Sequence, residues 1–281
     1  MEVIYHKKQL QDYIERQKEM GKKIGFAPTM GALHQGHISL YQKAREENDL
    51  VIASIFVNPT QFNNAEDLKK YPRNIEKDIS ILEKSKWVDM VYIPQVEDIY
   101  PENTISKHYD FGGIELAMEG ASRPGHFDGV GTVVEELFRQ VQPDNAYFGE
   151  KDFQQLAIIK KLTQLLNLPI KIHGVPIFRE KNGLAMSSRN ERLSVESREK
   201  ASIIHTALVQ AKDWFSEFSI EEISEKVAAL IASQKNMKLE YFVVADETSL
   251  QTTTTKNTSQ KYRAFIVVIV DGVRLIDTME M

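Results

Sequence analysis

The chain has 281 residues, of which 42% are hydrophobic and 27% charged, as in an ordinary globular protein with room for one or two domains. Its net charge of −5 argues against nucleic acid as a partner, although a local basic cluster can still bind a small anion. The lack of cysteine excludes disulfides and thiolate chemistry and fits a reducing, cytoplasmic location. No stretch approaches the roughly 20 apolar residues of a membrane span, so we expect no membrane partner.

The first strong pattern is a strand, a tight turn and a helix. Residues 22–27, KKIGFA, are a short apolar run that predicts a buried strand. Residues 28–37, PTMGALHQGH, form the turn. The following segment predicts a helix, because its apolar residues recur at near-helical spacing: Ile38, Leu40, Tyr41 and Ala44.

Two histidines of this turn are candidates for binding phosphate. Gly31 and Gly36 let the backbone turn sharply and approach a ligand, and the start of a helix favours an anion. His34 and His37 lie three residues apart there and can both donate hydrogen bonds to one phosphate. Glycine-rich turns are common, however, and a histidine near one is often only a cap or a surface residue.

A second strand and turn follow. Residues 50–57, LVIASIFV, are apolar throughout, which is typical of a central parallel strand. Asn58 and Pro59 end it, and this places Gln61 on the same rim as the histidines if the two strands are parallel neighbours. The alternative for Gln61 is an ordinary solvated loop residue.

The next segments predict scaffold. A helix is expected from about Asn74, with Ile75, Ile79 and Leu82 inward and its charged residues in solvent. Residues 89–94 predict a third strand. Residues 95–113 are rich in proline, glycine and polar residues, which indicates a long surface excursion.

Residues 119–130, EGASRPGHFDGV, predict a glycine-rich loop before an amphipathic helix over residues 131–141. Arg123, His126 and Asp128 form a polar cluster in this loop, and capping of the helix by Asp128 is the alternative to a binding role. The apolar positions of the helix are expected in the core: Val133, Val134, Leu137, Phe138 and Val141.

A second strand-to-helix junction lies at residues 145–149, NAYFG, followed directly by a helical pattern. Lys151, Asp152 and Gln155 fall in its first turn, and Lys151 and Gln155 share one face. A lysine at a helix N-terminus opposes the helix dipole. Lys151 therefore either has an anion nearby or extends into solvent.

Residues 170–178 predict the last strand of the first sheet, and residues 183–194, GLAMSSRNERLS, follow as a loop. Ser187, Ser188 and Arg189 are hydrogen-bond donors in a flexible setting, as in a mobile lid that closes over phosphates. Ser194 is interpreted as the N-cap of the next helix.

The pattern then changes from alternating strands and helices to two helices, over 194–234, followed by three strands. The last two strands are joined by a tight turn at Asp271 and Gly272. This change predicts a domain boundary near residue 176. The fold class is therefore α/β: a Rossmann-like parallel sheet with helices on both faces over 1–176, and a smaller α+β domain with an antiparallel sheet over 177–281.

Five segments, taken together, resemble the pantothenate synthetase (pantoate–β-alanine ligase) family: PTMGALHQGH, FVNPTQF, RPGHFDGV, YFGEKDFQQL and MSSRN. The resemblance covers most of the first domain and the start of the second. That family is similar to nucleotidyltransferases in which an HxGH loop and a later KMSKS-like loop bind ATP, and MSSRN stands where KMSKS would. It implies ligation of pantoate and β-alanine through a pantoyl-adenylate, with release of AMP and pyrophosphate, by a homodimer in which the second domain is a lid.

The resemblance also implies residue roles. His37 is carried over as the proton donor, and His34, Lys151 and Arg189 are expected to stabilise the phosphates, with Mg²⁺ bridging them and no protein side chain assigned to the metal. Gln61 and Gln155 match the pantoate-binding glutamines, and Gln61 is also expected near β-alanine. The implied ATP contacts are Met30, Gly31, Ala32, Leu33, His34, Gln35, Gly36, His37, Gly149, Glu150, Lys151, Asp152, Phe178, Met186, Ser187, Ser188 and Arg189.

One position departs from the family pattern. Residue 178 is Phe where a smaller aliphatic residue is expected, which favours a backbone contact with adenine over a side-chain contact. An apolar wall for the two methyl groups of pantoate is expected among Pro28, Met30, Val133, Val134 and Phe148, although helical spacing alone places Val133 and Val134 in the core.

Several other functions are less compatible with the motifs. The sequence GALHQGHI lacks the lysine and hydroxyl residue of a P-loop, the first turn lacks GxGxxG, and no HExxH is present for a zinc hydrolase. Two alternatives stay open: another HxGH adenylyltransferase with a different acceptor, and a nucleotide-binding regulatory module without catalysis.

Overall fold

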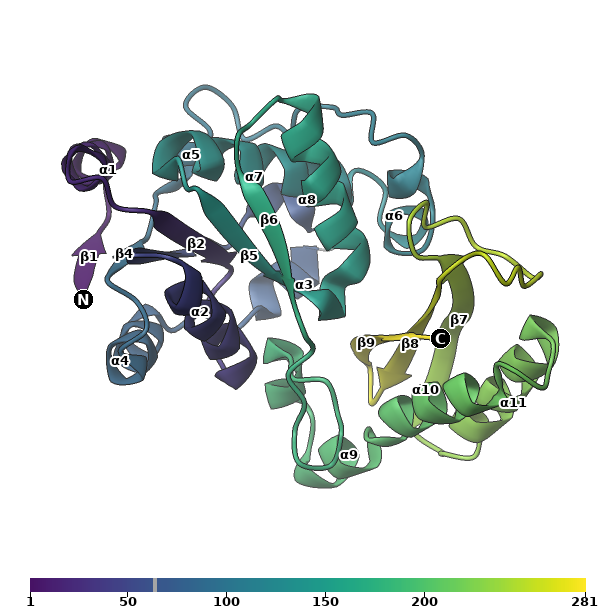
Figure 1. The fold of residues 1–281 in the computed structure, drawn as a ribbon. Helices are drawn as coiled ribbons and strands as arrows, with labels where there is room; N and C mark the ends of the chain where they lie inside the picture. Colours follow the sequence, from purple (N-terminus) through teal and green to yellow (C-terminus); the bar gives the residue numbers. More distant parts are fainter. Residues whose placement is uncertain (63–64) are drawn as a thin grey trace. The chain divides into compact units, whose positions relative to one another are not determined.

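The computed structural model describes residues 1–62 and 65–281, and the chain folds as two compact units (Figure 1). Unit 1 comprises Met1–Gly149 and Gln154–Pro176, and unit 2 comprises Glu150–Phe153 and Ile177–Met281. The chain therefore crosses between units at Pro176, and a four-residue segment at the second strand-to-helix junction groups with unit 2.

Unit 1 contains a six-stranded sheet in the order β1-β4-β3-β2-β5-β6, and every neighbouring pair is parallel. The predicted α/β class is confirmed. The strands are β1 (Glu2–Ile4), β2 (Ile24–Thr29), β3 (Leu50–Ile55), β4 (Met90–Tyr92), β5 (Asn145–Gly149) and β6 (Lys171–Val175). The sequence analysis missed β1, because three residues at the sheet edge carry too little hydrophobic pattern.

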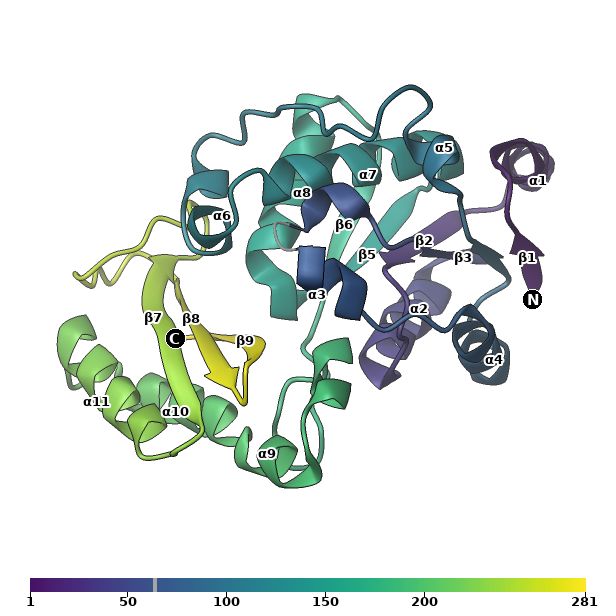
Figure 2. The same cartoon turned by 180° about the vertical axis from the view of Figure 1, so that it is seen from behind.

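Helices lie on both faces of this sheet (Figures 1 and 2). Helices α2 and α4 share one core cluster with the strands, and α1 packs against α7 on the other face. The α-helices of unit 1 are α1 (Lys7–Glu19), α2 (Gln35–Glu47), α3 (Ala65–Lys70), α4 (Ile75–Ser85), α5 (Val96–Ile99), α6 (Glu119–Ser122), α7 (His126–Val141) and α8 (Phe153–Leu165, whose first residue groups with unit 2). Short 3-10 turns are η1 (Pro59–Gln61) and η2 (Ile114–Leu116).

The inward face of α4 differs from the prediction. Leu82 is fully buried as expected, but Ile75 is 42% exposed. Its place on the inward face is taken by Asp78, which is only 1% exposed. A carboxylate is buried only where its oxygens have partners, so this residue requires an explanation from its contacts.

The predicted loop over 119–130 is also wrong, because it contains α6 and the first turn of α7. Glycine reduced the helical signal there, but Gly129 is required by a close approach: a Cβ atom on it would lie 2.9 Å from the backbone nitrogen of Gln61. The apolar positions expected inward from this helix, Val133 to Val141, are buried as predicted.

Unit 2 contains a three-stranded antiparallel sheet in the order β7-β8-β9, as expected. Its elements are η3 (Glu150–Asp152), η4 (Ser188–Arg192), α9 (Val195–Lys200), α10 (Ile203–Trp214), α11 (Ile220–Ala232), β7 (Met237–Asp246), β8 (Tyr262–Val270) and β9 (Val273–Glu280). Asp271 and Gly272 both have positive φ in the tight turn between β8 and β9. The region from 194 to 234 forms three helices rather than two, because the first run breaks after Lys200.

Helices α10 and α11 pack against the sheet of unit 2 and bury its core. In the part of the chain that the structure describes, no helix combines the length and the hydropathy that crossing a membrane requires.

Candidate active site

The histidine turn lies at the point where the strand order of the sheet reverses. Strand β2 pairs with β3 on one side and with β5 on the other. The loop over residues 30–34, which we call the β2–α2 loop, therefore opens at the carboxyl ends of the central strands. In open α/β sheets, ligands bind at such a switch point.

The buried carboxylate of Asp78 holds the β2–α2 loop. Its Oδ2 accepts a hydrogen bond from the Ala32 amide at 2.9 Å, and its Oδ1 accepts one from the Leu33 amide at 2.8 Å. Ala32 has a φ of +50°, which costs a non-glycine residue about 1–3 kcal/mol. Two hydrogen bonds to a charged acceptor, each contributing about 1.5–3 kcal/mol, are enough to offset that strain.

Most amides of the loop are bonded within the protein. The Gly31 amide donates to Thr29 Oγ1 and the His34 amide to His37 Nδ1, each at 3.3 Å. The Leu33 side chain is buried in the core as well. The amides of Ala32 and Leu33 are therefore not available to a ligand, because both donate to Asp78. An anion is left with the amides at the first turn of α2, those of Gln35 and Gly36.

His34 and His37 lie together, with ring centroids 4.0 Å apart in a stacked arrangement. His34 is the N-cap residue of α2 and His37 is in its first turn. Because His37 Nδ1 accepts from the His34 amide, a neutral His37 carries its proton on Nε2. His37 is therefore in the tautomer that can donate a hydrogen bond from Nε2.

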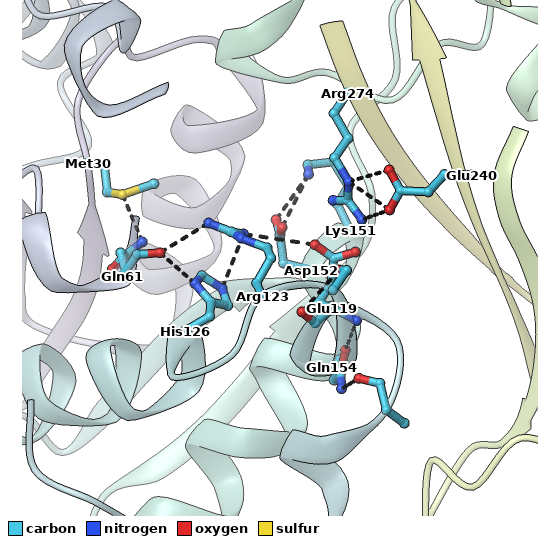
Figure 3. A network of polar contacts seen from close by, with 12 residues as sticks. Met30, Gln61, Glu119, Arg123, His126, Lys151, Asp152, Gln154, Glu240 and Arg274 are labelled. Atoms are coloured by element: carbon cyan, nitrogen blue, oxygen red, sulfur yellow. Dashed lines mark hydrogen bonds and ion pairs between the residues drawn. The ribbon is translucent and has the colours of Figure 1, made fainter. Parts of the chain in front are cut away.

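Gln61 lies beside Met30, the first residue of the β2–α2 loop, as Figure 3 shows. Its Nε2 donates to Met30 Sδ at 3.0 Å, and its Oε1 accepts from Asn58 Nδ2 at 3.3 Å. Asn58 is buried and also accepts at Oδ1 from the Tyr100 hydroxyl at 2.7 Å. Burial raises the pKa of Tyr100, so its hydroxyl keeps the proton that it donates. This chain of contacts fixes which end of the Gln61 amide donates.

Two side chains of the RPGHFDGV segment hold the backbone of Gln61 (Figure 3). His126 Nδ1 is 2.8 Å from the Gln61 carbonyl oxygen, and Arg123 Nη2 donates to the same oxygen at 3.1 Å. Asp128 does not cap α7; it accepts from the Tyr109 amide at 3.0 Å and thereby anchors the long excursion. Arg123 and His126 thus position Gln61, a candidate substrate-binding residue.

The two adjacent glutamines of α8 have different surroundings. Gln154 is buried, and its Nε2 donates to the carbonyl oxygens of Ile114 and Ala117, both at 2.8 Å. Its Oε1 accepts from the Glu119 amide at 3.1 Å, so this side chain is fully used in holding the 114–119 segment. Gln155 is partly exposed, so its amide is accessible to a ligand.

In unit 2, Lys151 lies in the η3 turn, and its Nζ is 3.1 Å from Asp152 Oδ2. This segment groups with unit 2 because Phe153 packs edge-on against Phe265 of β8 and under the guanidinium of Arg263. The turns η3 and η4 both pack against β9. Unit 2 therefore holds both Lys151 and the segment that contains Arg189 against one strand, β9.

The segment over residues 178–190, which we call the 178–190 hairpin, has its own anchors. The Met186 amide donates to the Phe178 carbonyl oxygen at 2.9 Å, while the Phe178 side chain is 41% exposed. Buried Asn190 donates to Glu180 Oε1 at 2.7 Å. Arg198 in turn donates to both oxygens of Glu180, at 2.8 Å from its Nε and Nη2.

The base of the same hairpin is fixed to β9. Arg179 makes a bidentate ion pair with buried Asp277, at 2.6 and 3.0 Å. Paired charges with this geometry are among the stronger polar contacts in proteins. The Arg189 amide donates to Ser187 Oγ at 3.3 Å, which orders the turn that carries the SSR sequence.

The structure thus divides the predicted ATP contacts between the units: Met30–His37 and Gly149 belong to unit 1, and Glu150–Asp152, Phe178 and Met186–Arg189 belong to unit 2. Among residues 1–62 and 65–281, no three His, Asp or Glu side chains are grouped as a metal site would require.

Sequence reasoning missed Asp78 and Asn58. Asp78 shares a helical face with Leu82, four residues later, and an acidic residue on an apolar face was the available signal. Asn58 was interpreted only as a turn residue, and no local pattern distinguishes that role from a buried network.

Comparison with known proteins identifies the family. The family model described as pantoate-beta-alanine ligase matches residues 2–280. The chain belongs to the pantoate–β-alanine ligase family. It is 53% identical over 260 residues to a pantothenate synthetase of Flavobacterium psychrophilum, with 92% of each chain covered.

Solved structures agree with this family. The pantothenate synthetase of Thermus thermophilus superposes with a TM-score of 0.91 at 37% identity, covering 100% of this chain and 99% of that one. The pantoate–β-alanine ligase of Francisella tularensis, solved as a complex with beta-gamma ATP and β-alanine, has a TM-score of 0.83 at 40% identity, covering 100% and 97%. The chain is thus an enzyme of a ligase family of pantothenate biosynthesis.

Proposed function

We propose that this ligase joins pantoate to β-alanine in two steps at the switch point of unit 1. In the first step a carboxylate oxygen of pantoate attacks the α-phosphorus of ATP, and the bond to pyrophosphate breaks. In the second step the β-alanine nitrogen attacks the acyl carbon, AMP leaves with the bonding electrons, and the nitrogen loses a proton as the amide forms. The mixed anhydride is needed because a carboxylate has no good leaving group.

The observation that carries this proposal is the contact between Gln61 and the β2–α2 loop. Gln61 Nε2 lies 3.0 Å from Met30 Sδ, so a carboxylate bound by Gln61 is next to the loop proposed to bind the triphosphate. Adenylation requires that adjacency, because the nucleophile and the α-phosphate must be held in line.

Each proposed residue has a defined task. Gln61 and Gln155 bind pantoate, and Gln61 also orients β-alanine. His37 donates from Nε2 to a phosphate oxygen, and His34, Lys151 and Arg189 oppose the negative charge that develops as pyrophosphate leaves. The remaining ATP contacts are those predicted from Met30–His37, Gly149–Asp152, Phe178 and Met186–Arg189.

Mg²⁺ is proposed to enter with the nucleotide. Where proteins bind Mg²⁺ with ATP, substrate phosphates supply several ligands and few side chains are needed. The donor chemistry described above fits that arrangement, since His34 and the first turn of α2 offer imidazoles and amides to the phosphates. When bound, the ion neutralises phosphate charge.

Three further expectations stay proposals: a homodimer, a cytoplasmic location, and a lid role for unit 2. Light scattering of the purified chain tests the first. Cell fractionation tests the second, and solution scattering with and without ATP tests the third.

The activity is tested by measuring AMP and pyrophosphate from ATP. We expect both only when pantoate is present, and pantothenate only when β-alanine is added as well. Turnover with a nucleotide or phosphate acceptor in place of pantoate would identify another adenylyltransferase. ATP binding without any turnover would identify a regulatory module.

A further inference from the structure

We propose that Asp78 is a positioning residue for the adenylation step: it holds the β2–α2 loop in the one conformation that aligns ATP. This inference rests on the proposed function, because it assumes that the loop binds the triphosphate. Asp78 is on α4, outside the segments that resemble the family motifs, and it is 1% exposed. It acts on the reaction only through the loop.

Both carboxylate oxygens of Asp78 contact the loop. Each carboxylate oxygen accepts from a different, consecutive amide, those of Ala32 and Leu33, at 2.9 and 2.8 Å. Two fixed acceptor atoms on one rigid group define both the position and the rotation of the peptide between them. A single hydrogen bond would fix the position only.

The loop is shaped to receive this carboxylate. Gly31 has a φ of +82°, and an ideal Cβ atom on it would lie 2.9 Å from Asp78 Oδ2. Ala32 follows with a φ of +50°. Successive backbone amides in a turn can bind an anion, and here the anion is supplied by the protein.

This arrangement separates the backbone amides of residues 32–36 into two groups. Asp78 occupies the amides of Ala32 and Leu33, so the triphosphate is directed to the first turn of α2, at Gln35 and Gly36, and to the two histidines. The same carboxylate helps to keep Met30 beside Gln61, since Met30 lies only two residues before the held Ala32. Asp78 therefore sets the register between the nucleotide and the pantoate carboxylate.

The experiment compares Asp78→Asn with Asp98→Asn in the full chain. Asparagine preserves the shape of residue 78 but turns an NH₂ group toward one of the two amides, so one hydrogen bond becomes a donor–donor contact. Asp98 is the matched control in unit 1, because its two oxygens also accept from backbone amides, those of Gln95 at 3.1 Å and Lys7 at 3.4 Å, away from the loop.

We expect Asp78→Asn to lower kcat/KM for ATP by about 10²-fold, as misplacement of reacting groups by about 1 Å commonly does, and to change KM for pantoate far less. ATP affinity, measured by calorimetry without pantoate, should fall in the same variant. Asp98→Asn should lower the melting temperature but keep the wild-type kcat/KM for ATP.

An Asp78→Asn protein that is folded and has wild-type kcat/KM for ATP would overturn the proposal. Equal losses for ATP and pantoate, or equal losses in Asp98→Asn, would overturn it too, because both mean a general structural effect. If Asp78→Asn does not fold, Gly31→Ala disturbs the same contact from the loop side, and unchanged ATP affinity in that variant contradicts the proposal. Wild-type protein that binds ATP but forms no AMP with pantoate would instead refute the proposed activity, and the calorimetry would still test Asp78.

Discussion

The β2–α2 loop of unit 1 and the 178–190 hairpin of unit 2 are both proposed to contact ATP, but they are held in different ways. The loop depends on one carboxylate, Asp78, which lies 45 and 46 residues away from its partners in the sequence. The hairpin has several separate anchors: Asn190 bonds Glu180 ten residues away, Arg198 bonds Glu180 eighteen residues away, and Arg179 pairs with Asp277 of β9.

The two regions should therefore differ in how strongly a single substitution disturbs them. Removing one partner of a buried polar pair leaves the other unsatisfied, at about 1–3 kcal/mol. In the hairpin, Glu180 keeps a second partner when either Asn190 or Arg198 is lost. In the loop, the consecutive amides of Ala32 and Leu33 share one carboxylate as acceptor, so its loss affects both at once. A single change at α4 should therefore disturb the loop more than a single change disturbs the hairpin.

The largest effect is expected at Lys151. Lys151→Ala should lower the adenylation rate by about 10²-fold or more, because one preorganised charge contact is lost from the transition state. Single-turnover formation of AMP measures it, and the exposed Lys160→Ala is the control. A near-normal rate would remove Lys151 from the catalytic group.

Two glycine-to-alanine substitutions, one in the β2–α2 loop and one in the 178–190 hairpin, test this difference. Gly31→Ala and Gly183→Ala both place a side chain at positive φ, +82° and +94°, and an ideal Cβ at residue 183 would lie 2.5 Å from His205 Nδ1. Each should lower the free energy of unfolding by about 1–3 kcal/mol. Only Gly31→Ala should also weaken ATP binding strongly, because its neighbour is Asp78. Equal loss of ATP affinity in both variants would contradict the difference between the regions.

Substitutions of the adjacent residues Gln154 and Gln155 test which of the two binds pantoate. Gln155→Ala should raise KM for pantoate more than KM for ATP. Gln154→Ala should instead lower the free energy of unfolding by about 1–3 kcal/mol, because the partly buried backbone groups of the 114–119 segment lose their partner. Urea unfolding and steady-state kinetics on both variants measure this, and the reverse pattern would show that the two roles are exchanged.

The smallest effect concerns pH. Burial lowers the pKa of His205, and the nearby Arg179 lowers it further. The unfolded chain therefore takes up the proton at higher pH, so the contribution of neutral His205 is complete above about pH 6.5 and is lost as pH falls through the lower folded value. Urea unfolding from about pH 7.5 to about pH 5 should show this slope, and His205→Asn should reduce it. An unchanged slope would exclude His205 as its source.

Much of the scaffold followed from local pattern. The strands β3 and β5, the helix α2 and the β8–β9 turn were predicted because apolar periodicity and turn chemistry are properties of a few consecutive residues. The region 119–130 was not predicted, since Gly129 is explained by its approach to Gln61, 68 residues earlier in the chain. A residue type that is required by a distant contact, such as this glycine, weakens the helical pattern of its own segment.

The sequence by itself determined the class of fold, the family motifs and the residue types suited to binding a triphosphate and a hydroxy acid. Only the tertiary structure decided which of two adjacent glutamines is already occupied, that Asn58, Arg123 and His126 orient Gln61, and that Asp78 holds the histidine loop. The physical reason is that backbone amides and carbonyl oxygens are the partners in most of these contacts. Every residue carries a backbone carbonyl and nearly every residue an amide, so no sequence pattern marks which ones a distant side chain will bind.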